Sequence, residues 1–294
     1  MTTKPEDKKP LAEDTTGHSA PNAGPPTDED LSANQMYQQA ELPSLARQIL
    51  SVIPMHGPTA ALFNLRRKAG TDDLEVVRSE VEVFPSAAIH TGMTQETVQD
   101  IRAQFGRSAN EVVGKLLRGI ANEQENARMM TFLDTESLAG PALNLSDSFN
   151  AETNLFEITQ RVHELVLQIN SKNTRSYEAF AVIPYKGLAG LMGLSKYAGA
   201  DDKNNRGLFI TEIGQTRFYF NPVPTSVTAY VGIKDHNNPS KSSGVFSPYV
   251  SDVINTINAD TGEFGYHIYN RFAITESPLH VAGNEMFHKF DVVV

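Results

Sequence analysis

The residue types that carry catalysis in other proteins are present in this sequence, but not at the spacing that their chemistry needs. The stretch 187–190 reads Gly-Leu-Ala-Gly and resembles a phosphate-binding loop only loosely. A dinucleotide-binding loop needs its glycines directly after a strand and an acidic residue about 20 positions later, and a Walker loop needs Gly-Lys-Ser or Gly-Lys-Thr. Neither pattern is present, so we interpret the stretch as part of a short helix that packs through its glycines.

Metal-ligating and nucleophilic residues are likewise isolated from one another. His163 and Glu164 adjoin on a predicted helix but lack the second histidine of a metalloprotease motif. The chain has no cysteine, which excludes a thiolate nucleophile and a cysteine metal site. No serine lies in a Gly-x-Ser-x-Gly motif, which marks the nucleophile of many hydrolases. We expect no catalytic residue, no cofactor and no metal ligand. The remaining histidines that we considered occur singly, at His56, His90, His236, His267, His280 and His288.

Charged residues are concentrated instead on a predicted hairpin. An apolar strand over 60–68 ends in three cations, residues 69–73 form a turn, and a second strand over 74–84 alternates valines with charges. Two interpretations are open: a solvated surface hairpin, or a projecting loop whose cations meet the acids of a neighbouring subunit. The charged positions are Arg66, Arg67, Lys68, Asp72, Asp73, Glu75, Arg78 and Glu80.

The stretch around which the chain is organised is a long interrupted helix over 94–134. Its apolar residues recur at helical spacing in two halves, with Thr94 and Ser108 as N-caps and Gly106 between the halves. If continuous, this helix would be on the order of 57 Å long, more than a domain of this size needs for its own core. It is either a brace for a large assembly or an ordinary helical hairpin in a globular enzyme.

The rest of the chain predicts a mixed α/β unit followed by further strands. A connector at 137–150 leads to an amphipathic helix, and alternating apolar residues indicate a long half-buried strand near the end. The predicted elements are helices at 155–169 and 186–194 and strands at 178–183, 208–213, 217–221, 227–233, 246–250 and 264–274.

Composition limits the classes of function. The net charge of −10 argues against a generic nucleic-acid binder, which presents a basic face. There is no apolar run of about 18 residues, so we expect no membrane span, no signal peptide and a chain soluble in the cytoplasm. Residues 1–40 contain five prolines and few large apolar side chains, which predicts an arm that is disordered or extended in isolation. Such an arm is either a simple tail or lies along neighbouring subunits.

The order of arm, hairpin, interrupted helix, α/β unit and returning strand resembles the HK97-like major capsid proteins of tailed phages. It is most similar to the capsid proteins of T-even-type myoviruses. The resemblance covers about residues 41–274 and rests on the stretches 42–66, 97–103, 246–250 and 265–274.

The resemblance implies an α+β, HK97-like capsid fold. Residues 1–40 would be a flexible N-terminal arm. Residues 41–134 would be the peripheral domain, with the E-loop at about 57–84 and the spine helix at about 94–134. Residues 135–244 would be the axial domain, and 245–294 would be return strands of the peripheral domain. The chain is shorter than the T-even-type proteins and lacks their inserted domain, so E-loop contacts and the arm would bear more of the assembly.

The implied function is that of a noncatalytic head protein. It would assemble as hexamers and pentamers into an icosahedral shell around packaged double-stranded DNA, in the host cytoplasm and then in the virion. Scaffold, portal and decoration or vertex proteins would be partners. Leu11-Ala12-Glu13 fits the apolar-x-Glu motif of T-even-type prohead proteases, which predicts cleavage after Glu13. The alternatives are a vertex protein of the same family, an encapsulin-like nanocompartment shell and a small-molecule enzyme.

Overall fold

The spatial arrangement comes from a computed structural model of the chain. The expected arm, the motif ending at Glu13 and the predicted helix 186–194 lie outside the residues that it describes. The described residues are 43–293 except 68–73, 85–86, 107, 146–150, 174–177, 185–207, 224–225, 236–237, 259–261 and 281–284.

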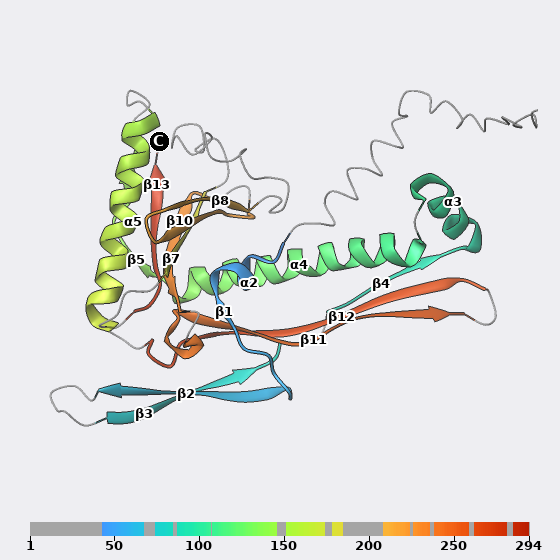
Figure 1. Cartoon of the computed structure of the whole chain (residues 1–294), viewed down its shortest axis with the longest axis horizontal. Helices are drawn as coiled ribbons and strands as arrows, with labels where there is room; N and C mark the ends of the chain where they lie inside the picture. Colours follow the sequence, from blue (N-terminus) through green and yellow to red (C-terminus); the bar gives the residue numbers. More distant parts are fainter. Residues whose placement is uncertain are drawn as a thin grey trace, which may run out of the picture.

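The long predicted helix is present and is interrupted at Gly106. Thr94 accepts a hydrogen bond from the Thr97 backbone N–H, and Ser108 accepts one from Glu111, so both predicted N-caps are confirmed. Gly106 has a left-handed backbone with φ of 61°, which glycine adopts without steric cost. The helix turns there, so the straight rod is α4 alone, about 42 Å long (Figure 1). The helices are α2 (Leu45–Ile49), α3 (Gln95–Phe105), α4 (Ala109–Glu136), α5 (Ala151–Asn173) and a short 3-10 helix, η2 (Pro239–Lys241).

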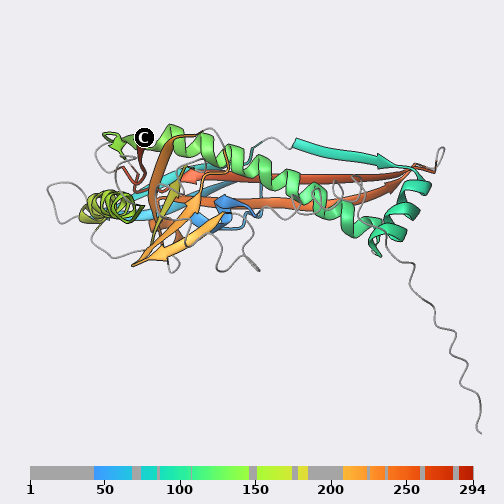
Figure 2. The same cartoon turned by 90° about the horizontal axis from the view of Figure 1, so that it is seen from above.

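The first sheet is a long ribbon that runs beside α4 (Figures 1 and 2). Its order is β1-β11-β12-β4, and the β11–β12 pair is antiparallel over nearly its whole length. Val113, Leu117 and Ala121 of α4 pack against Tyr266 and Ile268 of β12, which joins helix and ribbon in one core. Strand β4 and the outer half of β11 were not predicted. The strands are β1 (Ser51–Val52), β4 (Ala87–Met93), β11 (Gly244–Ile257) and β12 (Phe264–Glu276).

The second sheet lies at the C-terminal end of α4. Its order is β5-β13-β10-β7-β9-β8, with β6 also paired to β13. The expectation that residues 245–294 all return to the peripheral domain is wrong for β13, because β13 pairs with β10 in this sheet. The strands are β5 (Leu138–Ala139), β6 (Leu143–Asn144), β7 (Glu178–Ile183), β8 (Phe209–Ile213), β9 (Thr216–Phe220), β10 (Thr228–Lys234) and β13 (His288–Val293).

The middle of the second sheet is buried on both faces. Ala181 and Ile183 of β7 belong to the core that α5 makes with the sheet, through residues such as Ile158. Phe180 and Val182, which alternate with them, belong to the opposite core with α2 and the end of α4. This two-sided burial explains why 179–183 reads as an unbroken apolar run. None of the described helices is both long and apolar enough to cross a lipid bilayer.

Gly232 of β10 is a position where the packing requires glycine. A Cβ at Gly232 would lie 2.5 Å from Phe180 Cζ and 3.1 Å from Phe287 Cδ1, both in the core between the sheets. We expect Gly232→Ala to lower the free energy of unfolding by about 1–3 kcal/mol through overpacking. Urea unfolding followed by circular dichroism measures this change. Gly92→Ala in β4 is the matched control, since nothing lies within 4 Å of its added Cβ. Equal stability of the two variants would contradict the prediction.

Candidate subunit interface

The predicted charged hairpin is a two-stranded sheet of its own. Strands β2 (Thr59–Arg67) and β3 (Leu74–Glu82) pair antiparallel from Thr59 opposite Glu82 to Arg67 opposite Leu74. Figure 1 shows its two strands as a separate layer below the first sheet. A hairpin isolated in this way gains little stability from its own two strands, so its base must be anchored.

The base of the hairpin is anchored in the body of the subunit. Leu62, Val81 and Val83 are buried in a small core with Val245 of β11 and Ala273 of β12. The Phe84 N–H donates a hydrogen bond to the Phe272 carbonyl at 2.9 Å, which continues the attachment beyond β3. The projecting part therefore leaves from a fixed base, as a loop that reaches a neighbouring molecule must.

The hairpin also carries exposed apolar side chains that the sequence analysis did not single out. Phe63 is 59% exposed and Val76 is 67% exposed. Phe63 follows the buried Leu62 along β2, so its side chain lies on the opposite face. Val76 shares that face, because Phe63 is paired with Arg78 and Val76 stands two residues from Arg78 along β3. The signal was present in the sequence: 60–63 and 76–77 place apolar residues at consecutive positions, so both faces of the hairpin carry some.

The structure places the predicted interface residues in three groups. Arg78 and Glu80 form an ion pair of 3.0 Å within β3, with side chains 56% and 80% exposed, and the Arg78 guanidinium lies 6.0 Å from the Phe63 ring centre. Arg66 lies opposite Glu75 in the strand register, and Arg67 lies opposite Leu74. Lys68, Asp72 and Asp73 are outside the described residues.

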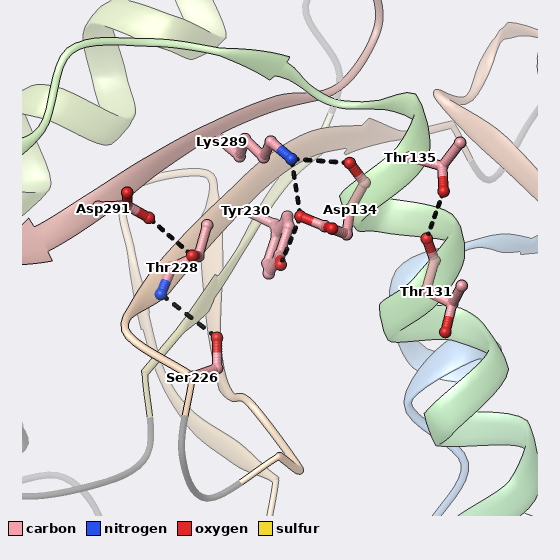
Figure 3. Close-up of polar contacts among 8 residues, drawn as sticks. All are labelled: Thr131, Asp134, Thr135, Ser226, Thr228, Tyr230, Lys289 and Asp291. Carbon is pink, nitrogen blue, oxygen red and sulfur yellow. Dashed lines mark hydrogen bonds and ion pairs between the residues drawn. The ribbon is translucent and has the colours of Figure 1, made fainter.

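The end of α4 is tied to the second sheet by a polar cluster (Figure 3). Lys289 of β13 donates hydrogen bonds to the Asp134 backbone carbonyl at 2.8 Å and to Asp134 Oδ1 at 2.7 Å. The last turn of α4 has no basic residue of its own, so Lys289 supplies the cation that favours a helix C-terminus. Burial, with the nearby Asp134 carboxylate, raises the pKa of Tyr230 to about 12, and its hydroxyl donates to Asp134. The sheet and the helix are thus held in one orientation.

A second cluster ties α2 to the middle of α4. Asn126 accepts a hydrogen bond from the Leu45 N–H at 2.7 Å and donates one to the Pro43 carbonyl. Glu125, whose side chain is 2% exposed, accepts from Arg47 at 3.3 Å and from Asn270 of β12 at 3.0 Å. These contacts join the start of α2 to the middle of α4.

A cavity between α2 and the second sheet has its cations engaged in structural contacts. It measures about 410 Å³ and is lined by residues of α2 and the second sheet, including Arg217 and Lys234. Burial lowers the pKa of Lys234 to about 8, but its ammonium donates to the Gln48 carbonyl at 2.7 Å and to the Arg47 carbonyl. Arg217 pairs with Glu212 and Glu178. This arrangement stabilises the end of α2 and does not favour the enzyme alternative.

Comparison with known proteins identifies the fold. No family model and no curated protein matches the sequence. Among solved structures, a virus-like particle from Pyrococcus furiosus is similar with TM-score 0.54 and 12% identity, over 88% of this chain and 96% of that one. A structure of Gordonia phage Cozz gives TM-score 0.54 and 11% identity, over 85% and 87%. The capsid of cyanophage P-SCSP1u gives 0.52 and 8%, over 83% and 86%. The chain therefore has the HK97-like capsid fold that the resemblance implied.

Proposed function

We propose that this chain is the major capsid protein of a tailed phage, with a structural and not a catalytic role. It assembles as hexamers and pentamers into an icosahedral shell that encloses packaged double-stranded DNA. The observation that carries the proposal is the anchored hairpin of β2 and β3, whose projecting face exposes Phe63 and Val76 beside the Arg78–Glu80 pair. An isolated subunit gains nothing from exposed apolar side chains on a projecting arm, whereas a subunit of a shell buries them against a neighbour.

The domain assignment follows from this proposal. The peripheral domain comprises residues 41–134 together with β11 and β12, and the axial domain comprises 135–244 together with β13. The hairpin is the E-loop and α4 is the main part of the spine helix. The T-even-type placement is supported by the sequence stretches 42–66, 97–103, 246–250 and 265–274.

The remaining parts of the proposal concern the assembled particle. The subunit acts in the virion after assembly in the host cytoplasm, with scaffold, portal and decoration or vertex proteins as partners. Cleavage after Glu13 belongs to the same proposal. Mass spectrometry of subunits from mature particles tests it, since an intact N-terminus would remove it.

The shell function is tested by negative-stain electron microscopy of the purified, untagged full chain after size-exclusion chromatography. We expect hollow particles of uniform size, or rings of five and six subunits. Nuclease-protected DNA in particles from the native source would support a phage capsid, whereas an enclosed protein cargo would support a nanocompartment shell. A monomer or dimer that binds a small metabolite would overturn the proposal.

The cations at the end of β2 give a further expected result. Reversing the charges of Arg66, Arg67 and Lys68 to glutamate should reduce the yield of assembled particles, because these cations meet acidic residues of a neighbouring subunit. Each exposed ion pair contributes only about 0.2–1 kcal/mol, but the contact recurs at every subunit. Assembly of the unaltered chain should also weaken as salt is raised, since salt screens such pairs. Particle yield by light scattering at low and high salt measures both effects, and unchanged assembly would count against the ionic contact.

A further inference from the structure

Three ionisable side chains meet where α4, β12 and the turn after β12 come together. Glu136 is the last residue of α4, Glu276 is the last residue of β12, and His280 follows in the turn. One carboxylate oxygen of each glutamate and one ring nitrogen of His280 lie within 4.8 Å of one another. At this separation the two carboxyl groups can share a hydrogen bond when one of them is protonated.

The hydrogen bonds of His280 show which of its nitrogens carries the proton. The Met286 backbone N–H donates to His280 Nδ1 at 3.2 Å, so Nδ1 is the unprotonated nitrogen of the neutral ring. The proton is therefore on Nε2, which lies 3.7 Å from Glu276 Oε2. A metal ion would need a free electron pair on Nε2. The geometry thus favours protons over a metal ion between these groups.

The surroundings disfavour two ionised carboxylates at this place. Glu136 stands at the C-terminus of α4, where the helix dipole is negative and the last turn contains no basic residue. Lys289 of β13 is engaged by Asp134, and Glu285 adds a further negative charge that acts on His280. An ionised Glu276 would face mainly negative charge.

The direction of the pKa shifts agrees with this geometry. Burial, with the hydrogen bond and charge of Glu136 adding to it, raises the pKa of Glu276 from its ordinary 4.5 to about 7. Burial lowers the pKa of His280, while the charges of Glu136 and Glu285 oppose that effect. The raised pKa of Glu276 brings its titration into the neutral pH range.

We propose that Glu136 and Glu276 form a proton-dependent latch, which joins the end of α4 to the end of β12 while the pair holds a proton and loosens when both are ionised. The latch lies where the chain passes from the first sheet to the second, since the turn after β12 leads to β13. Loss of the proton places two like charges in contact at this junction. The subunit is therefore held more firmly on the acid side of neutrality than on the alkaline side.

The latch sets the pH range in which stability changes. A group whose pKa is raised by folding binds its proton more tightly in the folded chain than in the unfolded chain. The stabilisation is complete below about pH 4.5 and is lost as the pH rises through about 7. Glu276→Gln keeps a neutral group that can donate to the Glu136 carboxylate at every pH. The variant should therefore retain above pH 7 the contact that the natural chain loses.

The test compares thermal unfolding of the full chain and of E276Q from pH 5 to pH 8.5, both as dispersed subunits. We expect the variant to have the higher Tm at pH 8.5, by about 3 °C, and an equal Tm at pH 5. E136Q should behave in the same way, because a glutamine amide at either position can donate a hydrogen bond to the remaining carboxylate at every pH. The titration of His280 is present in all these proteins, so it does not produce the difference.

A matched control removes the effect of net charge. E123Q neutralises an exposed carboxylate on the same helix, α4, in a chain whose net charge is −10. We expect E123Q to show no pH-dependent gain. A gain of the same size in E123Q, or no gain in E276Q, would overturn the latch. A rise in Tm of the natural chain with millimolar Mn²⁺ at pH 8.5, absent in E276Q, would replace the latch by a cation site.

Discussion

Replacing Phe63 with aspartate is expected to prevent shell assembly while leaving the subunit folded. Phe63 is 59% exposed and lies on the hairpin face away from the core at its base, so the isolated subunit loses no buried contact. Burying a phenylalanine at a subunit contact contributes about 1.5–3 kcal/mol, and burying a carboxylate there without a partner costs more. Because each 1.4 kcal/mol is a factor of about ten in affinity, every hairpin contact should weaken by at least tenfold.

The measurement is the fraction of protein in particles by size-exclusion chromatography and electron microscopy. Phe63→Leu is the matched control, since it keeps an apolar side chain at the same place and should still assemble. Val76→Asp should fail to assemble for the same reason as Phe63→Asp. Circular dichroism of the dispersed Phe63→Asp subunit must give the Tm of the natural chain. Normal assembly of Phe63→Asp would show that this face of the hairpin is not a subunit contact.

Local patterns predicted the parts of the fold that local physics determines. The break at Gly106, both N-caps and the strand 178–183 depend on residues close together in sequence, and each is confirmed. The hairpin strands were predicted for the same reason, because their register is set across one short turn. For such elements the sequence and the final environment favour the same structure.

The errors concern pairings between distant parts of the chain. Strand β13 pairs with β10, which lies about 60 residues earlier, and nothing in its alternation indicates which sheet it joins. Strand β4 contains alanines and a glycine, which have low strand propensity. It forms a strand because it pairs with β12 along its whole length. The Glu136–Glu276 contact likewise joins residues far apart in the sequence. On the hairpin, consecutive apolar residues indicate that both faces carry some, but which of them stay exposed depends on which face packs against β11 and β12.

Removing the Glu125 side chain is expected to cause a large loss of subunit stability. Its carboxylate is 2% exposed and accepts hydrogen bonds from Arg47 of α2 and Asn270 of β12, so it joins both elements to α4. Glu125→Ala leaves the buried Asn270 amide without this acceptor and opens a cavity, while Arg47 loses its ionic partner. A buried ion pair broken on one side costs about 3–5 kcal/mol, and the 42% exposure of Arg47 places the expected loss near the lower value, about 3 kcal/mol.

Scanning calorimetry of the dispersed subunit tests this expectation. A loss of about 3 kcal/mol should lower the Tm by about 6–12 °C in a chain of this length. Glu125→Gln is the informative control: it keeps an oxygen that can accept from Arg47 or Asn270 and loses only the charge, so its Tm should fall by about half as much. Glu123→Gln, on the exposed side of the same helix, should leave the Tm unchanged. A Glu125→Ala Tm close to that of the natural chain would mean that the apolar contacts of Leu45, Ile49 and Leu50 hold α2 in place without the buried carboxylate.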